Sequence, residues 1–468
     1  MTSISSERAW RARLLSRSYG PIFAGAAERV RVLFADGSDS SVARRLAGAA
    51  FLIRVASAVV AFASQIVLAR LLGGFQFGIY IYVWTWMLLL GGMVDFGLGS
   101  ASQRFIPEYI ELKNLALLRG YLRSSRWLAA TIATAIAVIA AALVKLLSPH
   151  LSANTVVPLY IACAALPICG LGQVLSGIAR SYDWVNLGLS PAYVLRQLLL
   201  LALFGSAFAM GSPMDAVTAT CTAVAAWWGV TIGQSVVLNR RLTKAVEPGP
   251  KAYAVRSWFS TAAPIFVVEA FYLLLTYSDV IVLQLFRPPN EVGIYYAAAK
   301  TMALVAFIYF SVAQTLAHKF AEYHVAGDRQ RLAGILATAV RMTFWPSLGS
   351  VLVLLAVGRP MLWMFGHGFV SGYYLMFILA IGLLARASVG PAERLLNMLG
   401  ERRSCALVYG CSFAFDIGLC LLLIPHFGIA GAAIANAVTL VCESASLFLI
   451  AKYRLGLHCF IFGGRQAR

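Results

Sequence analysis

Long apolar runs alternate with short polar segments from about residue 46 to about residue 452. An α-helix rises about 1.5 Å per residue, so about 20 apolar residues cross a hydrocarbon layer of about 30 Å. The runs predict twelve membrane-spanning helices, at residues 46–68, 78–100, 124–146, 154–177, 187–210, 216–238, 261–285, 293–316, 337–357, 369–391, 404–424 and 427–451. The sequence therefore predicts an all-α polytopic membrane protein.

The spans fall into two sets of six, which predicts two lobes around a central cavity. The expected parts are a basic cytoplasmic N-terminal segment, an N-lobe, a cytoplasmic inter-lobe loop, a C-lobe and a cytoplasmic tail, at 1–45, 46–238, 239–260, 261–452 and 453–468. The first part has eight Arg and no continuous apolar stretch, so it is not expected to be a signal peptide. Whether it lies on the membrane surface or forms a disordered tail stays open.

Composition and charge support the membrane interpretation. Hydrophobic residues make up 60% of the chain and charged residues 12%, whereas soluble domains usually carry about 25% charged residues. The net charge of +19 is divided into short clusters between apolar runs, which argues against nucleic-acid binding. An orientation with the N-terminus inside places 30 of the 38 Lys and Arg in inside segments and four in outside loops. This asymmetry predicts that both termini are cytoplasmic.

A shift of 215 residues aligns the two halves of the chain. VLARLLGGFQFGIY (67–80) then lies over VLQLFRPPNEVGIY (282–295), and the triplet Gly-Ile-Tyr matches at the end of both segments. Because six spans is an even number, both halves enter the membrane in the same sense. The repeat therefore predicts a two-fold axis along the membrane normal, as in transporters that rock about a central site.

Charged residues within spans predict where that site lies, since each costs about 2.5–3.5 kcal/mol at mid-bilayer on insertion scales. Polar residues of the first span recur at helical spacing, and the repeat shift places Arg54 over Glu269 and Ser64 over Asp279. We expect a hydrated cavity in which a few residues contact the substrate, namely Arg54, Ser57, Gln65, Lys300 and Arg196. Glu269 and Asp279 are the candidates for binding a coupling H⁺ or Na⁺.

Several of these charges also have a purely structural interpretation. Arg54 and Glu269 could neutralise each other, and Arg196 could pair with Asp416. Asp416 and Glu443 are expected to be paired within peripheral spans. A second set of charges near span ends is expected to be interfacial, namely Asp95, Arg386, Glu393 and Arg394.

The chain carries no motif that indicates a cofactor or a metal. It has no G-x-x-x-x-G-K-[ST] phosphate loop, and its six His and eight Cys show no metal-ligand spacing. The predicted outside loops are short and offer no room for a water-exposed catalytic site. We therefore expect no enzyme, no cofactor and no metal.

The segments LARLLGGFQFGIY (68–80) and SDVIVLQLFRPPNEVGIYYAAAK (278–300) are similar to those of the polysaccharide transporter family. This family comprises the Wzx-type flippases of the multidrug/oligosaccharidyl-lipid/polysaccharide (MOP) superfamily. The resemblance implies a bacterial inner-membrane flippase that moves an undecaprenyl-diphosphate-linked oligosaccharide by alternating access. It also implies membrane lipid as a partner, leaves open contacts with polysaccharide polymerase or export proteins, and leaves the coupling ion open between H⁺ and Na⁺.

Two rival functions remain open. A cation-coupled multidrug efflux carrier of the same superfamily would prefer an acidic and aromatic cavity, and Arg54 and Lys300 argue against it. A non-transporting scaffold of a polysaccharide-synthesis complex would use the basic N-terminus for docking, but it has no need of two matched halves.

Overall fold

The computed structural model describes residues 39–461, with side chains from residue 53 onward apart from several positions between 314 and 325 and position 402. The chain divides into two units, Met1–Leu52 and Ile53–Arg468. The described part of the first unit, residues 39–52, is the start of helix α3 (Asp39–Met93). The predicted basic segment lies almost wholly outside the described residues. The helical bundle from Ile53 onward is the second unit.

Every regular element within residues 53–461 is a helix. The elements that follow α3 in the first half of the chain, here called the N-half together with residues 53–93, are α4 (Leu98–Glu111), α5 (Leu115–Leu147), η1 (Ser148–His150), α6 (Ala153–Cys163), α7 (Leu166–Ser181), α8 (Val185–Ser190), η2 (Pro191–Leu195), α9 (Arg196–Ala209) and α10 (Ala216–Ala245). The second half, the C-half, comprises α11 (Val255–Phe286), α12 (Pro289–Met302), η3 (Ala303–Val305), α13 (Ala306–Val325), α14 (Arg329–Ala356), α15 (Gly358–Phe365), η4 (His367–Gly372), α16 (Tyr373–Val389), α17 (Ala392–Met398), α18 (Arg402–Phe427) and α19 (Ile429–Leu455).

These helices are long and apolar enough to cross a membrane, which confirms the predicted all-α polytopic fold. Within the described residues there are 10 candidate spans, or 11 if the bent pair Ala153–Cys163 and Leu166–Ser181 is one span. One candidate, Ile53–Glu111, has 59 residues, and a single bilayer needs only about 20. Its helix turns back at Gly73, whose φ of 71° and ψ of 167° are not helical. This stretch therefore has the length of two spans, which is consistent with the twelve predicted.

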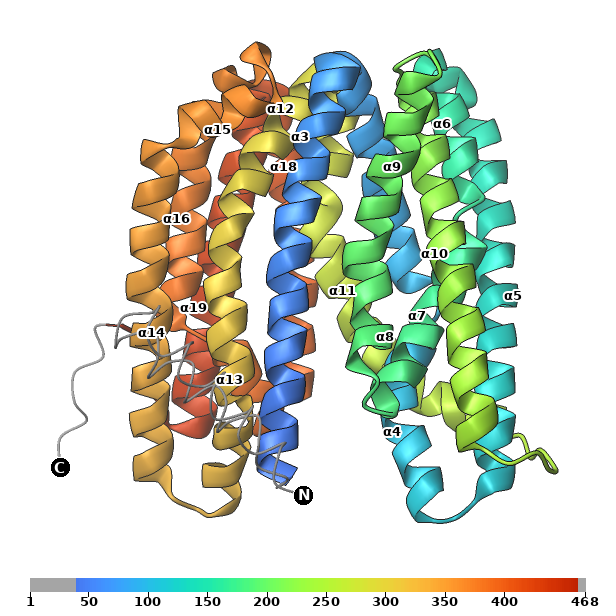
Figure 1. Ribbon diagram of the computed structural model, residues 1–468. Coiled ribbons are helices and arrows are strands. Elements are labelled where there is room, and N and C mark those ends of the chain that lie inside the picture. Colours follow the sequence, from blue (N-terminus) through green and yellow to red (C-terminus); the bar gives the residue numbers. More distant parts are fainter. Residues whose placement is uncertain (1–38, 462–468) are drawn as a thin grey trace, which may run out of the picture. The chain divides into compact units, whose positions relative to one another are not determined.

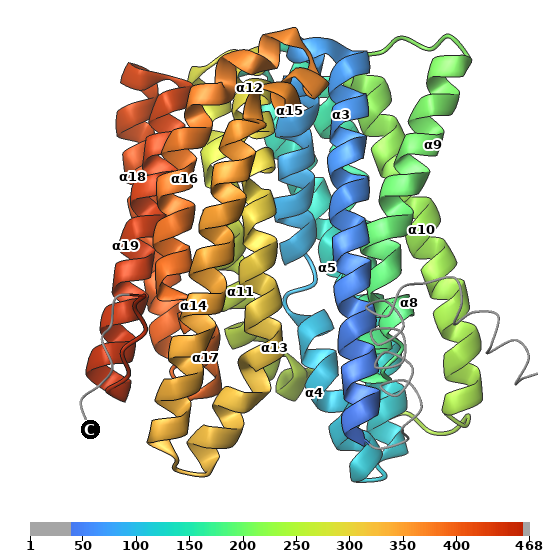
Figure 2. The ribbon, with the colours of Figure 1, turned by 60° about the vertical axis from the view of Figure 1, so that its left-hand side comes forward.

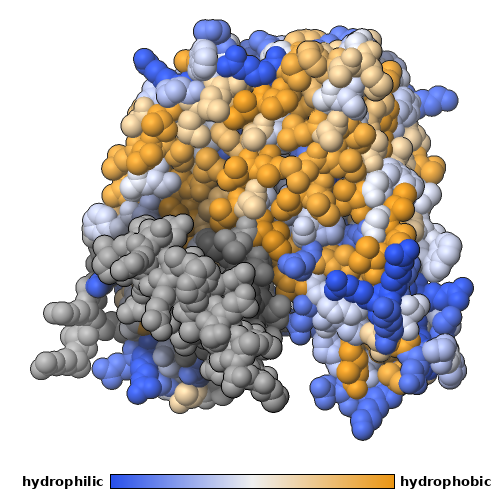
Figure 3. Space-filling view, viewed as in Figure 1, coloured by the Kyte–Doolittle hydropathy of each residue, from blue (hydrophilic) through white to orange (hydrophobic). Residues whose placement is uncertain are grey.

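The helices run roughly parallel, and those of each half pack mainly on one another (Figure 1, Figure 2). Hydrophobic residues form a broad band around the visible surface, while hydrophilic residues gather at its two ends (Figure 3). Such a band is the surface expected of helices whose outer sides face lipid.

Helices break at corresponding positions in the two halves, as the internal repeat of the sequence indicates. Gly73 ends the first part of α3, and its repeat mate Pro288 precedes the first residue of α12. The start of α5 is capped by the side chain of Asn114, which accepts from the amide of Leu117, and α14 is capped in the same way by Asp328. Breaks and caps therefore recur at nearly the repeat spacing of the sequence.

The two halves share one core at the end of the bundle that contains Gly73, the predicted outer end. That core joins Phe77 and Tyr80 of the N-half to Tyr295 and Phe365 of the C-half. Toward the opposite end, each half has a core formed mainly by its own helices. The structure is therefore joined at the predicted outer end, and at the predicted inner end its cores are separate, apart from Trp258 and Ala262 of α11, which belong to the N-half core.

The outer seam, as we call the contact of residues 70–78 with 289–296 and 363–369, is closed by close packing. A Cβ on Gly78 would lie 1.6 Å from the carbonyl oxygen of Pro289, so only glycine permits the approach. The Phe77 ring packs edge-on against Tyr296 and Phe369, with centroids 6.4 and 5.7 Å away. The guanidinium of Arg70 donates to the carbonyl oxygens of Met364 and Trp363 at 2.7 and 2.8 Å.

We expect Gly78→Ala to destabilise the protein, because the added methyl group forces the two helices apart. Overpacking typically costs about 1–3 kcal/mol. The control is Gly205→Ala, since a Cβ there meets nothing within 4 Å and alanine favours a helix. Thermal unfolding of the purified protein in detergent should show a lower midpoint for Gly78→Ala and no decrease for the control. Equal midpoints would mean that the seam is not tightly packed.

Candidate functional site

Three polar cavities meet at the middle of helix α11. The largest, about 310 Å³, lies in the C-half, and one of about 230 Å³ lies in the N-half. A third, also about 230 Å³, lies between α4, α7 and α11. Tyr277 lines the first two, Tyr272 the first and third, and Leu273 the second and third. Helix α11 therefore forms a partition in one central region.

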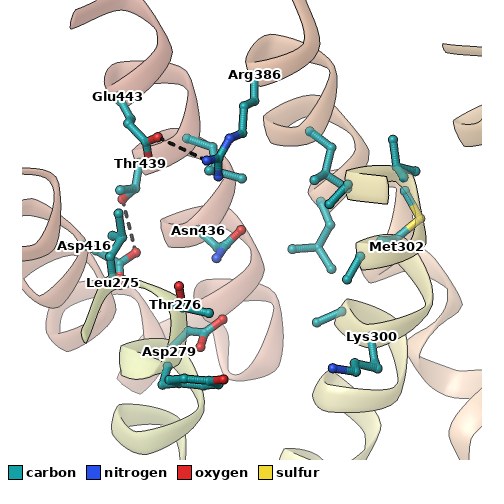
Figure 4. Close-up of a pocket in the computed structure, with 18 of the residues that line it drawn as sticks. Leu275, Thr276, Asp279, Lys300, Met302, Arg386, Asp416, Asn436, Thr439 and Glu443 are labelled. Carbon is teal, nitrogen blue, oxygen red and sulfur yellow. Dashed lines mark hydrogen bonds and ion pairs between the residues drawn. The ribbon is translucent and has the colours of Figure 1, made fainter. Parts of the chain in front are cut away.

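One group of charged side chains in the C-half cavity consists of two carboxylates and a lysine, which come from three helices (Figure 4). Asp416 of α18 is 1% exposed and accepts hydrogen bonds from the hydroxyl groups of Ser278 at 2.6 Å and Thr439 at 3.2 Å. Asp279 of α11 accepts from the amide of Val280 at 2.7 Å and from the hydroxyl of Tyr295. Among the described residues, Lys300 forms no ion pair, and its Nζ lies 5.9 Å from the centre of the Tyr296 ring.

A second charged group surrounds Arg386 of α16, which lines the same cavity together with Glu443. Its Nη2 lies 3.9 Å from a carboxylate oxygen of Glu443 on α19 and 3.9 Å from one of Glu393 on α17. Its guanidinium lies over the Tyr309 ring, 5.0 Å from the centroid. Arg386 and Glu393 were predicted to be interfacial, and this stays a prediction; their side chains are 25% and 20% exposed and pair with each other. The chain breaks at Gly390, where φ is 60°, and α17 brings Glu393 back to the guanidinium of Arg386.

The N-half cavity is positively charged and aromatic. Arg196 of α9 lies over the indole rings of Trp227 and Trp84, with its Cζ 4.1 and 5.5 Å from the ring centroids. Its Nε is buried and has no hydrogen-bond partner among the described residues. No carboxylate is among the described residues that line this cavity. A guanidinium with a free donor in an aromatic pocket is suited to an anionic group.

The third cavity contains Glu269 and Asp95. Glu269 of α11 accepts a hydrogen bond from the hydroxyl of Ser100 at 2.6 Å. Asp95 is 4% exposed and accepts from the amides of Gly97 and Gly99, at 3.3 and 2.9 Å. Its carboxylate fixes the turn between α3 and α4, and its predicted interfacial position stays a prediction.

The remaining predicted site residues lie on α3 outside these cavities. Arg54 lies over the ring of Tyr193, 5.2 Å from its centroid, and Tyr193 lines the N-half cavity. Ser57 donates to the carbonyl oxygen of Arg54 at 2.8 Å. Gln65 is 2% exposed and its Oε1 has no partner among the described residues.

Neither of the proposed structural pairs is formed in the described part of the chain. Glu269 accepts a hydrogen bond from Ser100 and does not pair with Arg54. Asp416 accepts hydrogen bonds from hydroxyl groups and does not pair with Arg196. Glu443 is paired as expected, with Arg386, but it lines the C-half cavity and is not peripheral. A helical stripe could have indicated this, because Asn436, Thr439 and Glu443 recur on one face of α19.

The arrangement can bind an anion and a cation in separate places. The C-half cavity offers carboxylate and hydroxyl oxygens, which are ligands for a proton or for Na⁺. Within the described residues, no group of three or more His, Cys, Asp or Glu could hold a metal ion. The substrate and ion roles of the predicted residues stay predictions.

Comparison with known proteins identifies relatives along most of the chain. Residues 45–321 match the model of a family described as polysaccharide biosynthesis protein. A relative from Haloferax volcanii, the probable low-salt glycan biosynthesis flippase Agl15, is 21% identical over 391 residues, 83% of this chain and 79% of that protein.

Two solved structures share the fold. An inward-facing multidrug-resistance MATE transporter of the MOP superfamily has a TM-score of 0.71 at 14% identity, over 87% of this chain and 98% of that chain. The lipid II flippase MurJ, in an inward closed conformation, has a TM-score of 0.68 at 14% identity, over 86% of this chain and 87% of that chain.

We expect Lys300→Cys, in a background in which the eight native Cys are replaced, to react with a small charged thiol reagent. A thiol must ionise to react, and it can do so in a wet cavity but not in hydrocarbon. The control is Leu352→Cys on α14, because Leu352 is 60% exposed on the surface predicted to face lipid. Labelling is measured by mass spectrometry. Equal labelling of Lys300→Cys and Leu352→Cys would argue against a water-filled cavity at Lys300.

Proposed function

The chain belongs to the polysaccharide biosynthesis protein family, and we propose that it is a flippase that carries a lipid-linked oligosaccharide across a membrane. The family match confirms the predicted resemblance. The proposal is supported by the flippase names of Agl15 and MurJ, and by the polar cavities that lie between the helices. We further propose that the membrane is a bacterial inner membrane, that both termini are cytoplasmic and that the lipid carrier is undecaprenyl diphosphate.

The separation of charge between the two cavities is the observation that carries the proposal. Among the described residues that line the N-half cavity, Arg196 is the one with a charged side chain. The C-half cavity has three carboxylates, Asp279, Asp416 and Glu443, against the two cations Lys300 and Arg386. An anionic diphosphate is therefore drawn to Arg196, whose planar fork suits phosphate oxygens. A coupling cation is drawn to the C-half.

Transport by alternating access follows from where the halves are joined. The head group enters at the predicted inner end, where the cores are separate, and its lipid tail remains in the bilayer. Release on the other side requires the outer seam to open, which breaks the two hydrogen bonds of Arg70 and separates Gly78 from Pro289. The repeat supplies a matched partner for each moving half.

The coupling ion, H⁺ or Na⁺, is assigned to Asp279 and Asp416. Both are buried, face one cavity and lie on different helices, so neutralising them changes the packing of α11 against α18. Glu269 is a weaker candidate, since its carboxylate already accepts a short hydrogen bond from Ser100.

A second candidate function is favoured by one observation. The C-half cavity is acidic and lined by tyrosines, as expected of a carrier that extrudes cationic amphiphiles. The N-half cavity, with its lone arginine and no described carboxylate, is unsuited to such a cargo. A deletion strain separates the two, because loss of an efflux carrier causes drug sensitivity without accumulation of lipid-linked glycan.

We expect Arg196→Gln to reduce glycan export about 10- to 100-fold. A charge-assisted hydrogen bond contributes about 1.5–3 kcal/mol, and about 1.4 kcal/mol corresponds to a factor of ten. The matched control is Arg331→Gln, because Arg331 is 73% exposed in an ion pair with Asp328. Both variants are expressed in a deletion strain, and lipid-linked glycan on the inner face is measured with protein level. If Arg196→Gln restores export fully, Arg196 does not bind the substrate.

We expect a disulfide across the outer seam to stop transport. A Cβ on Gly74 would lie 3.9 Å from the Cβ of Asn290, close to the mean of about 3.8 Å in disulfides. In the double variant Gly74→Cys/Asn290→Cys, an oxidant should abolish glycan export and a reductant should restore it, because the cross-link keeps the seam closed. The two single variants serve as controls. Export that continues with the cross-link formed would contradict opening at this seam.

A further inference from the structure

Glu443 is a buried carboxylate whose hydrogen-bonding capacity is unfilled. It is 1% exposed, and neither of its side-chain oxygens has a hydrogen-bond partner among the described residues. Its contact with Arg386 is an ion pair at 3.9 Å, longer than a hydrogen bond. The hydroxyl of Tyr409, which lines the same cavity and is 2% exposed, also has no partner within the described residues.

The charges around Glu443 do not balance. Arg386 lies equally far from Glu443 and Glu393, so one guanidinium neutralises two carboxylates. A buried carboxylate without a full ion pair costs several kcal/mol, and it lowers this cost by taking up a cation. The group therefore lacks one positive charge.

A proton fits this place better than a metal ion does. Groups from six other helices face Glu443 or line the cavity with it, namely Tyr272 of α11, Lys300 of α12, Tyr309 of α13, Arg386 of α16, Glu393 of α17 and Tyr409 of α18. Na⁺ needs several oxygen ligands and would have to sit beside the guanidinium, which repels it. A proton needs a single carboxylate oxygen.

We propose that Glu443 is a proton-binding site of the C-half, and that it exchanges one proton with the water of the cavity during each transport cycle. This inference rests on the proposed transport function and narrows its coupling ion to H⁺. On uptake, an O–H bond forms at a carboxylate oxygen of Glu443 while a hydronium ion gives up the proton. Arg386 then keeps Glu393 as its partner, and the charged link between α16 and α19 is released.

Glu443 also connects the inner end of the cavity to Asp416. Glu393 lies on α17, toward the predicted inner end, and accepts from the hydroxyl of Tyr309 at 3.5 Å. Thr439 is one turn before Glu443 on α19 and donates to Asp416. Glu443, Thr439 and Asp416 thus follow one another along the cavity, as labelled in Figure 4, and Glu393 is linked to Glu443 through Arg386.

The test is infrared difference spectroscopy of the purified full-length protein, titrated from acidic to neutral pH without any glycan. Acidification should produce the carbonyl stretch of protonated carboxyl groups, to which Asp279 and Asp416 also contribute, and one component of this band should be missing in Glu443→Gln. Glu443→Asp, which keeps a titratable group, should retain it. Glu401→Gln is the matched control, because Glu401 pairs with Arg454 at 3.0 Å outside the cavity.

Each outcome decides the proposal. Loss of that component in Glu443→Gln alone, with no effect of Na⁺, supports a proton site at Glu443. A spectrum of Glu443→Gln that matches that of the unchanged protein, or a Glu443 component that Na⁺ removes, would overturn it. The measurement needs no lipid-linked substrate, so it stands apart from the glycan-accumulation assay, whose failure would instead count against the flippase proposal.

Discussion

The closest contact between the two halves lies where the two copies of the repeated motif meet. Gly78 in the first copy contacts the backbone of Pro289 in the second, and Gly293 in turn lies against Gly74. Hydrophobic side chains of both halves are buried around this contact, in the core that contains Phe77, Tyr295 and Phe365. Because the halves are held at this end, the polar groups farther along the helices can line cavities without being closed over by packing.

Repetition of the backbone has not preserved the charges. The first span carries Arg54 where the seventh carries Glu269, and the N-half cavity is cationic while the C-half cavity has an excess of carboxylates. A symmetric pair of cavities would bind the same ligand twice. Two cavities of opposite charge in a matched frame can bind a substrate and a coupling ion at once, as the proposed cycle requires.

The sequence was sufficient for the features that depend on local pattern. Apolar run length predicted the helices, and the segments that it leaves between spans, 69–77 and 286–292, contain the helix breaks at Gly73 and Pro288. Lys300 and Asp279 were predicted near a cavity, and both line one. Position along a span did not predict the partner of Arg386, because the chain folds back at Gly390 and brings Glu393 within 3.9 Å of its guanidinium.

The sequence could not predict which charged residues of different spans pair with one another, because this depends on how the helices pack. The repeat suggested that Arg54 faces Glu269, but the inner part of α11 packs on the N-half. Phe266 stacks on Phe96 with centroids 4.6 Å apart, which brings Glu269 to Ser100. The outer part of the same helix packs on α18 of the C-half, so α11 crosses from one half to the other. Since Tyr277 lines both charged cavities, a displacement of α11 changes both together, and binding of anion and cation can be coupled through this one helix.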